Sequence, residues 1–233
     1  EGLGSATPTV LAAAVLGGSV DVDLLAAVLR VPPIELAAHL ELATERLLLD
    51  STESGYVFRH ALVRDALAGT VTTAYAALLH REAARTLQAR PASDPLEVAQ
   101  HARLGGDVEL AADALEAAAA IAARRFDRAA AEELLDQALR WSDTPGRRLA
   151  RARTRTMRGS YAGALDDVEA ALDGGAGAAA LEVGAWAAYF ARRVADARSF
   201  ADDGAALAVD PAVRASCLTV AGRVRHAAGD LAG

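Results

Sequence analysis

Apolar residues in the first part of the chain recur at the three- and four-residue intervals typical of helices with one buried face. Thr7-Pro8 begins one such helix, Asp21 can cap a second, and Pro32-Pro33 opens a third over residues 34–47. On this third helix, we expect an inward face made of Ile34, Leu36, Leu40 and Leu42 or Ala43.

The pattern then changes to two short apolar strands, LLLD over 47–50 and YVFR over 56–59. A glycine-containing loop separates them, which predicts a β-hairpin. Three helices followed by a hairpin are the plan of a winged helix, so residues 1–70 are predicted to form a winged-helix-like domain. Many winged helices read DNA through the third helix, but here that helix carries three glutamates and one arginine, Glu35, Glu41, Glu45 and Arg46. Phosphates would repel it, which favours a packing role over direct nucleic-acid binding.

Helical spacing returns beyond residue 70. Thr72-Thr73 caps a helix over 74–89, Ser93-Asp94-Pro95 starts another that ends at Gly105-Gly106, and Asp107 caps the next. Connections this short favour antiparallel packing of neighbouring helices. Residues 71–106 are therefore predicted to be connecting helices.

A repeat begins at Arg128. The segments 128–139, 161–172 and 194–205 align, and they carry small residues at two equivalent places, namely Ala131, Ala164 and Ala197 and then Ala138, Ala171 and Gly204. Equivalent positions are 33 residues apart, and the two places in one helix are two turns apart. Small residues on one face let a neighbouring helix approach closely. Each segment follows another predicted helix, over 108–124, 147–158 and 178–192.

A further first helix is expected from Asp210-Pro211 to His226, with Asp230 starting a truncated partner. Helix pairs of this length and spacing resemble the tetratricopeptide repeat, although alanine replaces most of the early tryptophan and glycine of that motif. The predicted fold is all-α with one small β-hairpin: a winged helix, then a tetratricopeptide-like solenoid of antiparallel helix pairs over 107–233.

Composition narrows the function classes. The net charge is −7, and every one of the 24 basic residues is arginine, so the chain has no GxxxxGK[ST] phosphate loop. Cys217 is the single cysteine, which excludes a disulfide framework, favours a reducing cytoplasmic location and fits a core position. No apolar run reaches the roughly 18 residues of a membrane-spanning helix, so no membrane contact is expected.

Catalytic patterns are missing from the sequence. His39, His80, His101 and His226 fall on separate predicted helices, which argues against zinc, and no GxSxG nucleophile motif occurs. We therefore expect no enzyme activity, no metal site and no cofactor in this chain.

A basic row is the main candidate site. Arg147, Arg151, Arg155 and Arg158 recur every three or four residues along one predicted helix. In one interpretation, acids of the following helix, Asp166, Asp167 and Glu169, neutralise a solvated face. In the other, the row binds an anionic ligand or acidic partner, and reversing Arg151 and Arg155 to Glu abolishes binding without unfolding the protein.

Three segments in order carry a family resemblance: FRHALVRDAL at Phe58–Leu67, LLHREAARTL at Leu78–Leu87 and AQHARLGGDVELAADALEAAA at Ala99–Ala119. The chain resembles the region after the nucleotide-binding module in large LuxR-type ATP-binding bacterial regulators, the LAL group of STAND ATPases. A similar region occurs in AAA-type regulators with cyclase or kinase output domains. The resemblance covers residues 8–230, and its most specific part is the first segment.

The resemblance implies a fragment of a signal-responsive transcriptional regulator. Its arm would bind an inducer or a protein partner, contact the protein's own nucleotide-binding module, and permit assembly into a homo-oligomer. His60 in the first segment could contact that preceding module, or it could simply cap or pack the strand-to-helix corner. The alternative to the regulator is a stand-alone adaptor whose groove binds a peptide or another protein.

Overall fold

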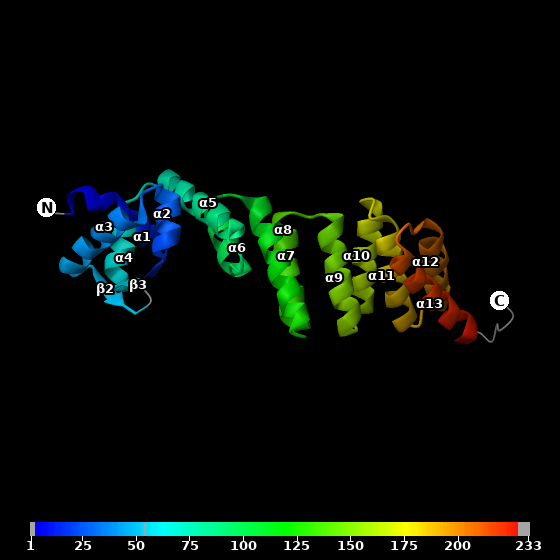
Figure 1. Ribbon diagram of the computed structural model, residues 1–233. Helices are drawn as coiled ribbons and strands as arrows, with labels where there is room; N and C mark the ends of the chain where they lie inside the picture. The colour runs from blue at the N-terminus through cyan, green and yellow to red at the C-terminus, as the bar shows by residue number, and fades with distance from the viewer. Residues whose placement is uncertain (1–2, 54, 228–233) are drawn as a thin grey trace. The chain divides into compact units, whose positions relative to one another are not determined.

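The computed structural model of the chain describes residues 3–53 and 55–227. These residues are mostly helical and include one small antiparallel sheet, which confirms the predicted fold class (Figure 1). The chain forms two compact units, Glu1–Ala114 and Leu115–Gly233, whose boundary falls inside α7 (Val108–Arg124). The finer division at residues 70 and 106 stays a prediction.

The first unit opens with a 3₁₀ turn, η1 (Gly4–Ala6), followed by α1 (Thr7–Leu16), α2 (Val22–Leu29) and α3 (Pro33–Glu45). The three α-helices pack against one another around a core that includes fully buried Leu25 and Leu36. Asp21 is the predicted cap: its Oδ1 accepts the N–H of Leu24 at 2.7 Å, which satisfies a donor that the first turn of α2 leaves free.

One predicted core residue of α3 is wrong. Ile34 is 82% exposed, whereas Leu36, Leu40 and Ala43 are fully buried. Those three are four and three residues apart and so share one face of α3. Ile34 precedes Leu36 by two residues, roughly 200° around the helix, and therefore points away from the core.

The predicted hairpin is present as β2 (Leu49–Thr52) and β3 (Gly55–Phe58), with Leu49 opposite Phe58. The sequence did not reveal a third strand, β1 (Ser19–Val20), which pairs with the other edge of β3 to give the order β1-β3-β2. Two residues are too few to show an alternating pattern, so only pairing with β3 defines this strand. The helices and the sheet together have the arrangement of a winged helix.

Among the described residues, the first unit also contains α4 (Ala61–Gly69), α5 (Thr73–Ala89), α6 (Pro95–Leu104) and the start of α7. The hydroxyl of Thr72 and the carboxylate of Asp94 accept backbone N–H groups at the starts of α5 and α6, as predicted. α4 packs on α1, α5 packs on both α1 and α2, and α6 packs on α5. These contacts join the predicted connecting helices to the winged helix in one core.

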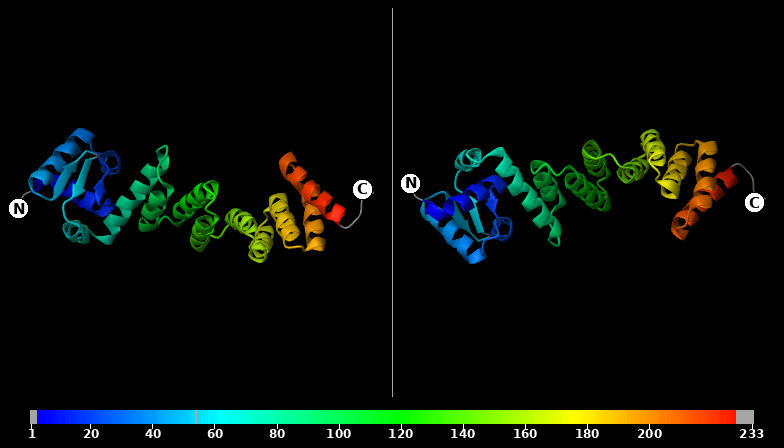
Figure 2. Two further views of the ribbon diagram at one scale, coloured as in Figure 1. Left: turned by 90° about the horizontal axis from the view of Figure 1, so that it is seen from below. Right: turned by 90° about the horizontal axis from the view of Figure 1, so that it is seen from above.

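Up to residue 227, where the description of the chain ends, the second unit contains the C-terminal part of α7 and six further helices (Figure 2). These are α8 (Arg128–Trp141), α9 (Pro145–Arg158), α10 (Tyr161–Asp173), α11 (Gly177–Phe190), α12 (Val194–Leu207) and α13 (Pro211–Ala227). Each helix from α8 onward packs against the next, and α11 also contacts both α9 and α13. The first helices of successive pairs thus lie side by side in one layer. Asp230, the predicted start of another helix, lies outside the described residues.

Small residues occupy the close contacts predicted from the repeat. Ala131, Ala164 and Ala197 have no exposed surface, and Ala138 and Ala171 at the second place are equally buried. At that place α12 has Gly204, where an added Cβ would lie 2.7 Å from Cys217 Sγ and 3.2 Å from Leu181 Cβ. The hairpins therefore nest because side chains at these positions are short.

Replacing Gly204 by Ala should destabilise the second unit by about 1–3 kcal/mol, because the extra methyl overlaps Cys217 and forces α12 and α13 apart. Gly222 on α13 is the matched control, because a Cβ there meets no atom within 4 Å. Gly222→Ala should raise stability by roughly 0.5–1 kcal/mol through helix propensity. Urea unfolding followed by tryptophan fluorescence measures both, since Trp141 and Trp186 lie in this unit. Equal effects at the two positions would contradict the close-packing explanation.

Candidate functional site

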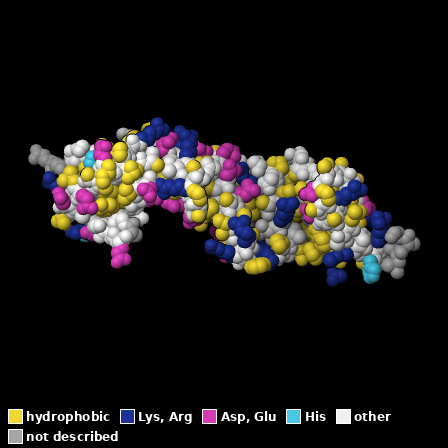
Figure 3. Space-filling model, viewed as in Figure 1, with side chains coloured by type: hydrophobic (Ala, Val, Ile, Leu, Met, Phe, Trp, Pro, Cys, Tyr) yellow, Lys and Arg dark blue, Asp and Glu magenta, His cyan; other side chains and the backbone are white. Residues whose placement is uncertain are grey.

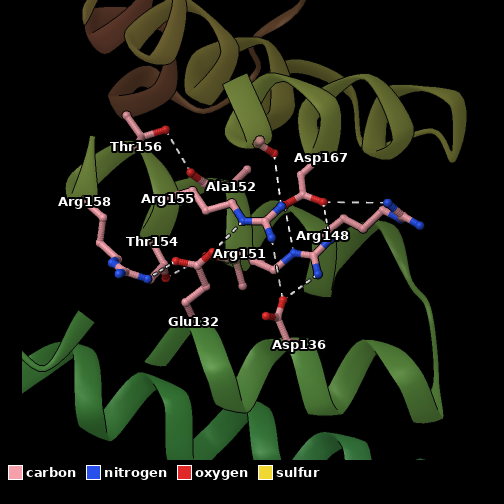
Figure 4. A network of polar contacts seen from close by, with 12 residues as sticks. Glu132, Asp136, Arg148, Arg151, Ala152, Thr154, Arg155, Thr156, Arg158 and Asp167 are labelled. Atoms are coloured by element: carbon pink, nitrogen blue, oxygen red, sulfur yellow. Dashed lines mark hydrogen bonds and ion pairs between the residues drawn. The ribbon is translucent and has the colours of Figure 1, made fainter. Parts of the chain in front are cut away.

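The predicted basic row lies on α9, between α8 and α10 (Figure 4). Its central members converge on Asp167 of α10, whose side chain is almost completely buried. Arg151 donates from Nε to Oδ2 at 2.9 Å and from Nη2 to Oδ1 at 2.6 Å, a two-point contact. Arg155 donates from Nη1 to Oδ2, also at 2.9 Å. Hydrogen bonds between ionised groups of this geometry are the strong ones in proteins.

Acids of the preceding helix complete the network. Arg155 Nε donates to Glu132 Oε1 at 2.8 Å, and Arg151 Nη1 donates to Asp136 Oδ1 at 2.6 Å. Arg158, at the end of the row, also donates to Glu132. Burial raises the pKa of Glu132, but the bonds from Arg155 and Arg158 outweigh it and hold that pKa below its ordinary value. The row therefore links α8, α9 and α10 through charge.

The other end of the row is also enclosed. Arg147 is only 4% exposed, donates from Nη1 to the Ser142 carbonyl at 3.0 Å, and lies 3.5 Å from a carboxylate oxygen of Glu116. Of the three acids predicted to neutralise the row, Asp167 does so, while Asp166 and Glu169 are exposed outside the network. Binding of an external anion by this row stays a prediction. Reversing Arg151 and Arg155 to Glu is now expected to unfold the unit, because both residues carry ion pairs in its interior.

His60 occupies the residue before α4, in extended conformation, where the strand ends and the helix begins. Its side chain is exposed and makes no capping hydrogen bond. It is therefore accessible to another surface, and an interdomain contact there stays a prediction.

Two histidines that the sequence placed apart meet in the first unit. His80 of α5 and His101 of α6 are buried, with Nδ1 atoms 2.8 Å apart, so one ring donates and the other accepts. Burial, the other histidine and Arg103 lower the pKa of His80 from 6.5 to about 4. Burial likewise lowers the pKa of His101. Across the described residues, no group of three or more His, Cys, Asp or Glu side chains could hold a metal ion.

Aromatic rings gather around α11 in the second unit. The chain has only two tryptophans, four tyrosines and four phenylalanines. Trp186, Tyr189 and Phe190 of α11 contact one another with ring centroids 5.5–6.1 Å apart, and Phe190 also stacks on Tyr161 at 6.0 Å. Arg223 of α13 lies over the rings of Trp186 and Tyr189, at 5.1 and 6.0 Å. The Trp186 indole N–H donates to Ser216 Oγ at 2.9 Å, which fixes the ring against α13.

Two cavities flank Phe190. One, of about 250 Å³, opens between α9 and α11 and is lined by Met157, Trp186 and Phe190 among others. The second, of about 500 Å³, lies among α11, the start of α12 and α13. Met157 is 65% exposed and Phe190 is 46% exposed, so both present apolar surface to solvent at the smaller cavity that they line together. The set Met157, Trp186, Tyr189, Phe190 and Arg223 is called the aromatic face below.

The sequence contains a periodic signal for this face. Met157, Phe190 and Arg223 are 33 residues apart in turn, so they occupy one equivalent place in three successive first helices. The repeat period aligns them, but it does not show that this side of the helices remains uncovered. On the side visible in Figure 3, hydrophobic side chains are interspersed with acidic and basic ones.

Comparison with protein-family models, curated proteins and solved structures finds no match to this chain. Among the described residues, none of the helices has the length and apolar character needed to cross a membrane.

Proposed function

We propose that the chain is the sensing and partner-binding arm of a signal-responsive bacterial transcriptional regulator. In this proposal, the arm binds an inducer or protein partner in the cytoplasm and controls a nucleotide-binding module outside the chain. Its role is binding, with no catalytic step or cofactor of its own. The observation that carries the proposal is the aromatic face, because it combines exposed apolar side chains with two adjacent cavities.

The chemistry of the face supports binding. Aromatic residues, methionine and arginine are the side chains that binding surfaces favour, and here they lie on adjacent helices of a packed layer. A rigid scaffold of this kind reduces the entropy lost when a ligand is held. By contrast, arginines of the basic row on α9 donate their hydrogen bonds to acids within the protein.

Regulation is proposed from the sequence resemblance. Its most specific part, Phe58–Leu67, covers the end of β3 and most of α4, where the exposed His60 lies. Sequencing the coding region upstream of Glu1 separates the regulator from a stand-alone adaptor. A GxxxxGK[ST] loop encoded there supports the regulator, whereas a start codon directly before Glu1 would leave only the adaptor.

A substitution on the aromatic face should disable the regulator in cells. Met157→Glu places a charge beside the smaller cavity, and because Met157 is mostly exposed, stability should change by no more than about 0.5 kcal/mol. We expect the variant strain to reproduce the transcript changes that deletion of the gene causes, as measured by RNA sequencing. Val209→Glu is the control, because Val209 is 97% exposed and lines neither cavity. That strain should match the wild type.

Two results would contradict the proposal in different ways. A deletion strain with unchanged transcripts would show that the protein does not regulate transcription. A Met157→Glu strain that matches the wild type, with the deletion strain altered, would show that regulation uses another surface.

A further inference from the structure

The larger cavity beside Phe190 has the dimensions and lining of a small-molecule site. Its volume of about 500 Å³ lies within the roughly 300–1,000 Å³ of known ligand pockets. The walls are Tyr189, Phe190, Val194 and Val224, so most of the lining is aromatic or aliphatic. Such walls accept an apolar group that leaves water on binding.

The charged side chains that line this cavity are all positive. Arg192 and Arg223 both line the cavity, and no carboxylate does among the described residues. Neither arginine forms an ion pair within the part of the chain that the structure describes, whereas the arginines of the row on α9 are bonded to acids. Two positive groups beside apolar walls create a local field that attracts an anion.

Arg223 is also held in place for such an anion. Its guanidinium lies over the rings of Trp186 and Tyr189, and Trp186 is itself fixed by the bond to Ser216. Cation–π attraction to the two rings holds this positive charge beside the cavity. The planar guanidinium carries five N–H donors that can bond to a ligand. Those groups match the paired oxygens of a carboxylate or a phosphate.

We infer that this cavity binds a small amphipathic anion, with an aromatic or aliphatic body against Phe190 and Val224 and one carboxylate or phosphate group on Arg192 and Arg223. The inference rests on the proposed function, since this anion would be the inducer that the arm senses. It concerns a different part of the molecule from the basic row on α9.

Four related probes test the inference by isothermal titration calorimetry with the 233-residue chain. They are 3-phenylpropionate, 2-phenylethyl phosphate, the neutral 3-phenylpropionamide and the cationic 3-phenylpropylamine. Because hydrogen bonds to ionised groups are the stronger ones, at least one anion should bind about tenfold or more tightly than the amide. The amine should bind no more tightly than the amide. The preferred anion identifies the group as carboxylate or phosphate. An amide or amine that binds as well as both anions would overturn the inference.

Substitutions locate the site. Arg223→Gln and Arg192→Gln should each weaken the preferred anion by about tenfold and leave amide binding unchanged, since only the charged contact is lost. Both side chains are exposed, so the variants should fold, which circular dichroism checks. Arg198→Gln is the matched control, because Arg198 lies on α12, outside the cavity, and should bind as the wild type does.

Equal weakening by all three substitutions would show general attraction of anions rather than a site, and it would also overturn the inference. These measurements use the isolated chain and are therefore independent of transcription. Failure of anion binding with an altered Met157→Glu strain would leave the regulator proposal in place. Anion binding by the chain, together with a deletion strain whose transcripts are unchanged, would remove only the regulatory role.

Discussion

Replacing Asp167 by Ala should destabilise the second unit by about 3–5 kcal/mol, the usual cost of leaving buried charges without their partner. Asp167 is 1% exposed and accepts hydrogen bonds from both Arg151 and Arg155. Without it, two guanidinium groups stay partly enclosed between α8 and α10 with less compensation. Urea unfolding followed by the fluorescence of Trp141 and Trp186 reports this unit, which contains both tryptophans.

Asp166 provides the matched control, because it is the neighbouring aspartate on the same helix and is exposed. Asp166→Ala should change stability by no more than about 0.5 kcal/mol. The loss in Asp167→Ala should also persist in high salt, since buried ion pairs are screened far less than exposed ones. If the two variants unfold at the same urea concentration, the network on α9 does not stabilise the unit.

The first unit should lose stability as the pH falls from 7 to 4, through the buried pair His80 and His101. Folding lowers the pKa of His80 from 6.5 to about 4. Between these two pH values, His80 is therefore mostly protonated in the unfolded chain and mostly neutral in the folded chain. Stability is therefore present above pH 6.5 and declines as the pH drops toward 4. His80 alone contributes a loss of about 2 kcal/mol by pH 5 and about 3 kcal/mol by pH 4.

Hydrogen exchange of the amides of α5 and α6 measures this loss, because the tryptophans lie in the other unit. The double variant His80→Gln, His101→Gln is the comparison, since two amides can still share a hydrogen bond but do not titrate. After correction for intrinsic exchange rates, the free energy of opening measured for this variant should be nearly the same at pH 7 and at pH 5. A wild type with the same flat profile would show that the pair does not carry the acid sensitivity.

The repeat was predictable because its cause is local and periodic. Ala131, Ala164 and Ala197 are small at equal spacing, and short side chains at those places are what lets helix pairs stack. Helix starts were equally readable, because capping by Asp21, Thr72 or Asp94 depends only on residues within the first turn. The burial of Cys217 followed from its apolar helical surroundings.

The sites were less predictable because they join separate helices. The row on α9 was visible as a pattern, but Glu132 and Asp136 lie on the preceding helix, and nothing local shows that they turn toward it. His80 and His101 are 21 residues apart, and their contact depends on how α5 packs on α6. The aromatic face depends on which side of a helical layer stays uncovered.

By itself, the sequence determined the helices, their caps, the hairpin and the stacking of small residues, because each depends on neighbouring residues or on a regular period. Tertiary structure alone decided that β1 pairs with β3 and that Ile34 points outward. It also decided that arginines of the basic row bond to acids inside the protein, and that His80 and His101 are in contact. These outcomes require groups distant in sequence to share space, and the free energy of such contacts depends on their geometry and burial as well as on residue type.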